Sequence, residues 1–279
     1  MQTHLRADIH PTAIIADGAE FGDGVAIGPY AIVGSQVRLG DRCRVGSHAV
    51  IEGDTWLGED CIIYPKAILG TPAQDKKLSP DAAAGKLRMG ARNRIREFVT
   101  INCGTPHGGG VTKIGDDNMF LAASHIGHDC LVGNGSVFTN LSLSAGHVVF
   151  EDGALLGAGV GIHQFCRVGS LAMVGAGSMV TKDVSPYAVI QGDRARLRGI
   201  NLIGLKRAGF SPDRLRLIKQ AYRELCWRQS NLKDRLAKVR EIAGKDPAIL
   251  HLADFVEVSK RGIVMPKGDM EEGDEGAEA

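Results

Sequence analysis

Four of the nine histidines of this 279-residue chain lie between residues 125 and 163, and they are the strongest candidates for chemistry. They are His125, His128, His147 and His163. An unperturbed imidazole has a pKa of about 6.5, so a histidine can act as a general base near neutral pH. Asp129 follows His128 directly and is a candidate to orient or charge-stabilise its ring. Residues this far apart form a site only if the fold brings them together.

A six-residue repeat runs through most of the chain. From Ile9 to Leu69, and again from Ile114 to Val180, every sixth residue is an anchor, and 22 of these 23 anchors are apolar. At 44% apolar composition, chance would give about ten. The period fits neither a helix nor a simple alternating strand, and it is typical of a β-helix built from hexapeptide repeats. The sequence therefore predicts a mainly β fold.

The position four residues after each anchor is small and is also expected to face inward, as at Ala31, Ala49 and Cys61. Cys130 and Cys166 occupy the same position, so we interpret them as core residues. None of the six cysteines forms a C-x-x-C pair. The pattern favours reduced core thiols over a disulfide or zinc framework.

The repeat resembles the left-handed parallel β-helix of hexapeptide-repeat transferases, in which three hexads make one triangular coil. The handedness is taken from this resemblance. Positions three hexads apart would then be stacked, roughly 4.8 Å from one another. His128 would be stacked on Gly146, beside His147, and on Gln164, beside His163. We therefore predict that distant histidines meet at one edge over three coils.

The predicted cluster favours direct transfer with His128 as general base. The N–H of Gly146 is a candidate oxyanion donor, and a glycine there allows a substrate to approach the backbone closely. No serine or cysteine is obviously placed as an activated nucleophile, which argues against a covalent acyl-enzyme.

Three regions are expected along the chain. Residues 1–200 would form the β-helix, with excursion loops near 71–88 and 107–113 where the repeat breaks. Residues 201–262 would form a C-terminal α-helical domain, with Ser211 and Pro212 as an N-cap and first-turn pair and a last helix at about 247–261. Residues 263–279, with six acids and one lysine, would be a disordered acidic tail. The glycines at 108–110 lack the strand-to-helix context of a phosphate cradle, so a flexible loop is expected there.

The overall composition excludes several classes of function. A net charge of +1 indicates neither a nucleic-acid partner nor an anionic membrane. No apolar run is long enough to cross a bilayer, so no membrane span is expected. The first residues lack a secretory apolar segment, so a cytoplasmic location is expected.

Several motifs closely resemble those of the UDP-N-acetylglucosamine O-acyltransferases that begin lipid A biosynthesis. The likeness covers about residues 9 to 262. Its motifs are the QDKK loop (74–77), RNRIRE (92–97), GGGVTKIG (108–115), HIGHDC (125–130), AGH (145–147), HQFC (163–166) and NLIGLKRAGF (201–210). The resemblance implies transfer of a 3-hydroxyacyl group from acyl carrier protein to the 3-OH of UDP-N-acetylglucosamine. It also implies a homotrimer with sites between subunits, with no metal and no cofactor beyond the phosphopantetheine that carries the donor.

The same resemblance implies roles for individual residues. His128 would be the general base, Asp129 its partner and the Gly146 amide the oxyanion donor, with His147 nearby. The substrate contacts would be Gln74, Asp75, Lys77, His125, His163 and Gln164, and the nucleotide contacts Asn201 and Arg207. Ala176 would end the acyl groove, and its size favours an intermediate chain length. Ile203 replaces an acidic residue of some members, which leaves part of nucleotide recognition open.

Other interpretations remain open at this point. A zinc enzyme similar to the trimeric γ-class carbonic anhydrases would place three neutral histidines, here His128, His147 and His163, on the metal. The related N-acyltransferases of the same pathway, or a purely structural β-helix, are further alternatives. Residues 205–262 carry a net charge of +7, which suits an acidic carrier protein and equally an ordinary basic surface. The sequence does not distinguish a hydroxyl from an amino acceptor.

Overall fold

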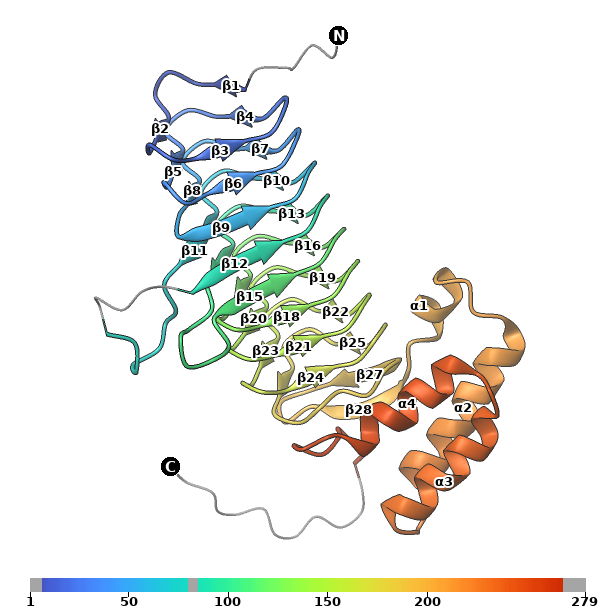
Figure 1. Cartoon of the computed structure of the whole chain (residues 1–279). Coiled ribbons are helices and arrows are strands. Elements are labelled where there is room, and N and C mark those ends of the chain that lie inside the picture. Colours follow the sequence, from blue (N-terminus) through green and yellow to red (C-terminus); the bar gives the residue numbers. More distant parts are fainter. Residues whose placement is uncertain (1–6, 80–84, 268–279) are drawn as a thin grey trace.

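The computed structural model describes residues 7–79 and 85–267, which form a three-sided parallel β-helix followed by helices (Figure 1). Each side of the prism is one sheet, and each complete coil adds one parallel strand to every sheet. The last strand of the longest sheet, Arg196–Ile200, pairs antiparallel with the strand before it.

Sheet A contains β1 (Asp8–Ile9), β4 (Ala26–Ile27), β7 (Arg44–Val45), β10 (Ile62–Ile63), β13 (Arg94–Ile95), β16 (Met119–Phe120), β19 (Val137–Phe138), β22 (Leu155–Leu156), β25 (Met173–Val174), β27 (Ala188–Gln191) and β28 (Arg196–Ile200). Sheet B contains β2 (Ile14–Ile15), β5 (Ile32–Val33), β8 (Val50–Ile51), β11 (Ile68–Thr71), β14 (Thr100–Asn102), β17 (His125–Ile126), β20 (Leu143–Ser144), β23 (Gly161–Ile162) and β26 (Met179–Val180). Sheet C contains β3 (Glu20–Phe21), β6 (Arg38–Leu39), β9 (Asp54–Leu57), β12 (Lys86–Met89), β15 (Val111–Ile114), β18 (Leu131–Val132), β21 (Val149–Phe150) and β24 (Arg167–Val168).

The pairing of strands follows the predicted stacking. Ile9 pairs with Ile27, and Ile27 pairs with Val45, so each anchor is stacked on the anchor three hexads further along the chain. From Ile27 onward the apolar anchors of the repeat fill the interior of the prism, and the smaller inward position is also buried, as at Cys61, Cys130 and Cys166. The coils after the first therefore close over one apolar core. The prediction of core thiols is confirmed for the five cysteines of the β-helix, whereas Cys226 is half-buried.

The two excursion loops have bounds that differ slightly from the prediction. Residues 72–85 separate β11 from β12, and residues 103–110 separate β14 from β15. Lys86 pairs with both Asp54 and Val111, so both loops end before the hexad period resumes at the anchors Met89 and Ile114. The strands β12 and β15 start to pair three residues before their apolar anchors, because the neighbouring strand β9 is also four residues long and offers them a partner. Both excursions leave the same side of the prism (Figure 1).

The helices follow the last coil: α1 (Leu202–Arg207), α2 (Pro212–Trp227), α3 (Leu232–Ala243) and α4 (Pro247–Glu257). The predicted cap is confirmed, since the side chain of Ser211 accepts a hydrogen bond from the Arg214 N–H and Pro212 opens the helix. The last helix ends at Glu257, earlier than predicted. No described helix is both long and apolar enough to cross a membrane.

The expected tail does not begin at residue 263. Ile263 forms a bridge with Asp183, Val264 is buried, and the carbonyl of Met265 accepts a hydrogen bond from Leu197. These apolar residues pair with the end of the β-helix because the acidic run begins only after them. Residues 268–279, which hold the acids, lie outside the described residues.

The helical region is attached to the prism by a titratable contact. His251 of α4 places Nε2 2.7 Å from Oε2 of Glu151, and the Ser170 hydroxyl donates to the same oxygen. The hydrogen bond to Glu151 raises the pKa of His251. Burial acts to raise the pKa of Glu151, but its hydrogen bonds with His251 and Ser170 outweigh burial and lower it.

This contact predicts a pH-dependent contribution to stability. The His251 contribution is fully present below its unfolded pKa of about 6.5 and is lost as pH rises through the raised folded value. The Glu151 contribution is present above about pH 4.3 and is lost as pH falls through the lowered folded value. We expect the Tm difference between the parent and His251→Gln to be largest between about pH 4.3 and about pH 6.5, and to shrink toward pH 9. Thermal unfolding of both proteins across this range checks it, and an equal difference at every pH would contradict it.

Candidate active site

A groove of about 750 Å³ runs along the outer face of sheet B and reaches the corner where sheet B turns into sheet C. The predicted site residues that line it are Gln74, His125, His128, Gly146, His163 and Gln164. Its floor includes outward residues of three paired strands, Leu143, Gly161 and Met179. The groove therefore combines an apolar floor with imidazoles at one edge.

The corner between sheets B and C places the catalytic candidates in two stacked columns. His128, Gly146 and Gln164 form one column in the arithmetic of the repeat, and Asp129, His147 and Phe165 form the next. The His147 N–H donates to the carbonyl of His128, which joins the coils at this point. Asp129 and His147 have φ of 58° and 61°, a left-handed conformation that is uncommon for non-glycine residues. The corner thus turns these side chains toward one another.

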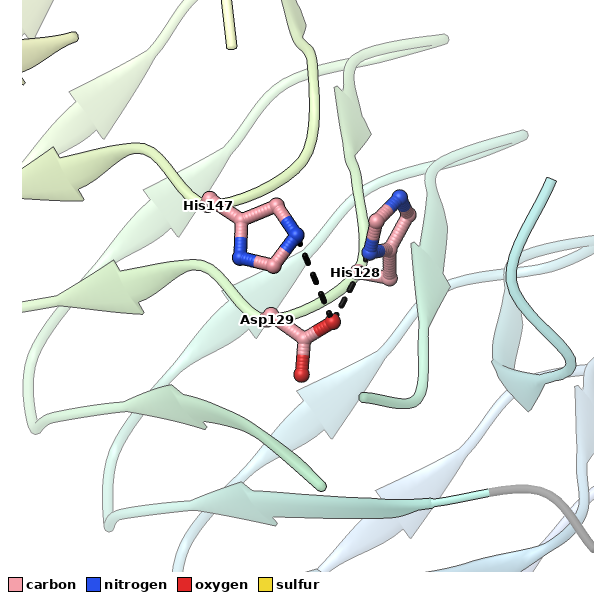
Figure 2. A group of neighbouring side chains, drawn as sticks. All are labelled: His128, Asp129 and His147. Carbon is pink, nitrogen blue, oxygen red and sulfur yellow. Dashed lines mark hydrogen bonds and ion pairs between the residues drawn. The ribbon is translucent and has the colours of Figure 1, made fainter. Parts of the chain in front are cut away.

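His128 and Asp129 form a hydrogen-bonded pair (Figure 2). Nδ1 of His128 lies 2.8 Å from Oδ2 of Asp129, and Nε2 of His147 lies 3.9 Å from the same oxygen. Only 2% of the Asp129 side chain is exposed, compared with 14% for His128. The aspartate therefore lies on the same side of the corner as His128 and does not point to the opposite face.

The carboxylate of Asp129 is also held from a second loop. Both the N–H and the hydroxyl of Thr105 donate to it, at 3.0 and 2.7 Å. Burial acts to raise the pKa of Asp129, but the hydrogen bonds from His128 and Thr105 outweigh it and lower the pKa. When ionised Asp129 accepts a hydrogen bond from Nδ1–H of a neutral His128 ring, Nε2 is left with a free lone pair. That is the tautomer a general base requires.

Gly146 is packed against the His128 ring. A Cβ on Gly146 would lie 2.6 Å from both Cε1 and Nε2 of His128, closer than any side chain tolerates. The backbone of residue 146 therefore lies directly beside the proposed basic nitrogen. Within residues 7–79 and 85–267, the Gly146 N–H has no hydrogen-bond acceptor. It is free to bind a developing negative charge in the groove.

Two further histidines are held in fixed orientations. His147 stacks on Phe165 with ring centroids 4.5 Å apart and meets His128 edge-on at 5.0 Å. Burial lowers the pKa of His147. His125 forms a 2.7 Å hydrogen bond between Nδ1 and the Thr100 hydroxyl, and burial lowers its pKa too. Both rings are therefore expected to stay neutral near pH 7.

The remaining predicted residues divide into two groups. Asp75 and Lys77 lie in the first excursion, where Asp75 accepts a hydrogen bond from the Lys77 N–H. Asn201, Arg207 and Ala176 do not line the groove within this chain. Asn201 caps α1 and Arg207 ends it, whereas Ala176 is exposed at the corner between sheets A and B.

Two residues of the second excursion were not predicted. Thr105 donates hydrogen bonds to the Asp129 carboxylate, and His107 places Nε2 2.9 Å from Oδ2 of Asp75. The stacking rule could not find them, because they leave the repeat and no fixed period relates them to their partners. The available signal was a polar Thr-Pro-His sequence entering a glycine-rich loop beside the HIGHDC motif.

One group of described side chains has donor atoms close enough to share a metal ion. It is His128, Asp129 and His147, whose donor atoms lie within 4.8 Å of one another. His163 is not part of it, so the three-histidine zinc set is not assembled within the described chain. The aspartate is already bound by Thr105 and His128, an arrangement suited to an orienting carboxylate.

Comparison with known proteins connects this geometry to a family. Residues 183–264 match the model of UDP-N-acetylglucosamine O-acyltransferase domain 2, and residues 18–53 match the bacterial transferase hexapeptide model. An acyl-[acyl-carrier-protein]–UDP-N-acetylglucosamine O-acyltransferase from Alkalilimnicola ehrlichii is 48% identical over 92% of this chain and 98% of its own. The protein of that name from Thiobacillus denitrificans is 47% identical over 92% and 99%.

Solved structures agree with this match. The UDP-N-acetylglucosamine acyltransferase from Francisella novicida is 34% identical with a TM-score of 0.89, covering 92% of this chain and 94% of its own. The enzyme from Moraxella catarrhalis is 37% identical with a TM-score of 0.87, covering 92% and 99%. The predicted left-handed parallel β-helix with a C-terminal helical region is confirmed. The chain has a hydrogen-bonded His128–Asp129 pair at a groove, and its relatives are similar to it along nearly their whole length. It therefore belongs to the acyl-[acyl-carrier-protein]–UDP-N-acetylglucosamine O-acyltransferase family.

Proposed function

We propose that this chain transfers a 3-hydroxyacyl group from acyl carrier protein to the 3-OH of UDP-N-acetylglucosamine, the first step of lipid A biosynthesis. Family membership supports the substrates, and the His128–Asp129 pair at an apolar groove supports the chemistry. The observation that carries the proposal is the free Nε2 of His128 beside the unpaired N–H of Gly146, among the described residues. A base and an oxyanion donor are the two groups that acyl transfer to an alcohol requires.

The reaction follows from these positions. Nε2 of His128 takes the proton of the sugar hydroxyl as its oxygen attacks the thioester carbonyl. Ionised Asp129 stabilises the imidazolium that forms, and the Gly146 N–H binds the developing oxyanion. When the intermediate collapses, the C–S bond breaks and the thiolate takes the proton from His128. The base is thereby restored, and the proposed reaction uses no metal and no cofactor beyond the carrier's phosphopantetheine.

The groove suggests where each substrate part binds. The apolar floor at Leu143 and Met179 suits the acyl chain. Asn201 and Arg207 lie on another part of the chain, so they would serve a site completed by a second subunit. The proposed polar contacts to the sugar nucleotide are Gln74, Asp75, Lys77, His125, His163, Gln164, Asn201 and Arg207.

We further propose a homotrimer. Apolar side chains are exposed along sheet B and its corner with sheet A, including Ile14, Tyr30, Phe98 and Leu141, each between 56 and 61% exposed. An exposed apolar face of this kind is typical of a subunit interface. A sedimentation experiment that finds only monomer at micromolar concentration would contradict the homotrimer.

The helical region at residues 205–262, with its net charge of +7, would attract the acidic carrier protein. We also propose that the enzyme acts in the cytoplasm.

A mass-spectrometric assay with UDP-N-acetylglucosamine and a panel of 3-hydroxyacyl carrier proteins tests the proposal. Transfer to the sugar hydroxyl is the expected result. Transfer only to an amino-substituted sugar nucleotide would instead indicate an N-acyltransferase. Zinc retained at one ion per chain after dialysis, with carbonic anhydrase activity and no acyl transfer, would favour the zinc alternative.

The assignment of Ala176 as the acyl-length stop makes a separate prediction. Because a bulkier side chain closes a groove earlier, Ala176→Gly should shift the preferred donor toward longer chains. Competition among donors of different length in one reaction measures this shift. An unchanged profile would show that Ala176 does not set the length.

A further inference from the structure

The two excursion loops are joined by a contact that the reaction does not use. Nε2 of His107, from residues 103–110, lies 2.9 Å from Oδ2 of Asp75, from residues 72–85. The Asp75 side chain is 18% exposed and that of His107 is 43% exposed. The other oxygen of Asp75 accepts a hydrogen bond from the Lys77 N–H. Both oxygens of this carboxylate are therefore fixed.

The start of the first excursion is also held in place, by a side chain of β14. The side-chain amide of Asn102 donates to the Thr71 hydroxyl at 2.8 Å and to the Pro72 carbonyl at 3.1 Å. Between these bonds and the His107–Asp75 contact lies Gln74, which lines the groove. Gln74, the one described residue of this excursion that lines the groove, is thus flanked by contacts from β14 and from the segment that follows it.

The second excursion also contacts the catalytic pair. Thr105 donates twice to Asp129, and the backbone at Gly108 packs so closely on the Asp129 carboxylate that a Cβ there would collide with it. His107 lies between these two residues in the chain. The loop that holds the catalytic aspartate therefore also holds Asp75.

We propose that His107 is a positioning residue that holds Asp75, and through it the neighbouring Gln74 at the groove, in fixed relation to the His128–Asp129 pair. This inference rests on the proposed function. Closing a flexible excursion costs conformational entropy, and a contact present before binding removes that cost from the binding step. His107 acts through Asp75 and takes no part in proton transfer. Its loss should therefore weaken acceptor binding more than it slows the chemical step.

Kinetics of three variants test this role. His107→Leu removes the donor at similar volume, and we expect KM for UDP-N-acetylglucosamine to rise about tenfold, because a hydrogen bond to a charged group is worth roughly that much. We expect kcat to stay within about threefold. His107→Gln keeps an N–H donor and should restore most of the affinity. His10→Leu, an exposed histidine in β-helix coils far from the groove, should leave both constants unchanged.

A double variant and a substrate-free measurement complete the test. In an Asp75→Asn background, His107→Leu should add little further loss, since the partner is already weakened. Trypsin cleavage at the exposed Lys76 and Lys77 should be faster in His107→Leu than in the parent or His10→Leu, with unchanged Tm.

The inference is overturned by an unchanged KM in His107→Leu, by a fall in kcat alone, or by trypsin cleavage at the parent rate. If the parent itself transfers no acyl group, the proposed function fails. In that case the cleavage rates still decide whether His107 holds the first excursion.

Discussion

Replacing His128 with alanine is expected to lower kcat about a thousandfold, within the range of ~10²–10⁴ that general-base catalysis contributes. Nδ1 of this ring is hydrogen-bonded to Asp129, so the other ring nitrogen, Nε2, is available to a substrate in the groove. The proposed contacts to the substrates are made by other residues, so KM for both substrates should change little. The acyl-transfer assay measures both constants.

The fold should tolerate this change, because His128 lies at a corner of the prism outside its apolar core. His10→Ala is the matched control and should keep the parent rate. A His128→Ala enzyme within tenfold of the parent would exclude this residue as the base. If the parent and the variant were both inactive, a scaffold role would be favoured instead.

Gly146→Ala should produce the second large loss, about a hundredfold or more in kcat. The added methyl group would lie 2.6 Å from Nε2 of His128, so the ring or the corner must move. Either movement separates the base from the Gly146 N–H, and removing one oxyanion donor alone costs ~10²–10³ in rate. Steady-state kinetics with the preferred donor check the loss.

Gly199→Ala provides the control for a glycine-to-alanine change. A Cβ at Gly199 meets nothing within 4 Å, so this variant should keep its activity and Tm. A Gly146→Ala enzyme with unaltered kcat would mean that the ring position in this structure is not the catalytic one.

Much of this site followed from periodicity, and the reason is physical. A coil of three hexads, which was taken from the family resemblance, fixes which side chains share an edge, and the repeat arithmetic then placed His128 beside Gly146 and His147. It also identified the inward thiols, such as Cys130, because only small side chains fit that position. The helix cap at Ser211 depended on local chemistry and was equally predictable.

The parts that sequence reasoning missed depend on contacts outside the repeat. Thr105 and His107 reach their partners only after the chain has left the prism, and no period relates them to Asp129 or Asp75. The expected tail failed at Ile263 and Val264 for a related reason. The acidic composition predicted disorder, whereas Ile263 forms a bridge with Asp183 of the last coil and Val264 is buried.

The strand pairing also bears on how such an enzyme could diversify. Ile68 pairs with Thr100 and Thr100 pairs with His125, and each of these two coils contains one of the excursions. The next coil, which joins His125 to Leu143, has the regular length of three hexads. The surplus length is thus placed in the coils just before the corner that holds His128 and Asp129. We expect insertions there to change what lies beside the groove without disturbing the stacking of His147 on Asp129, because the coil that joins them keeps its regular length.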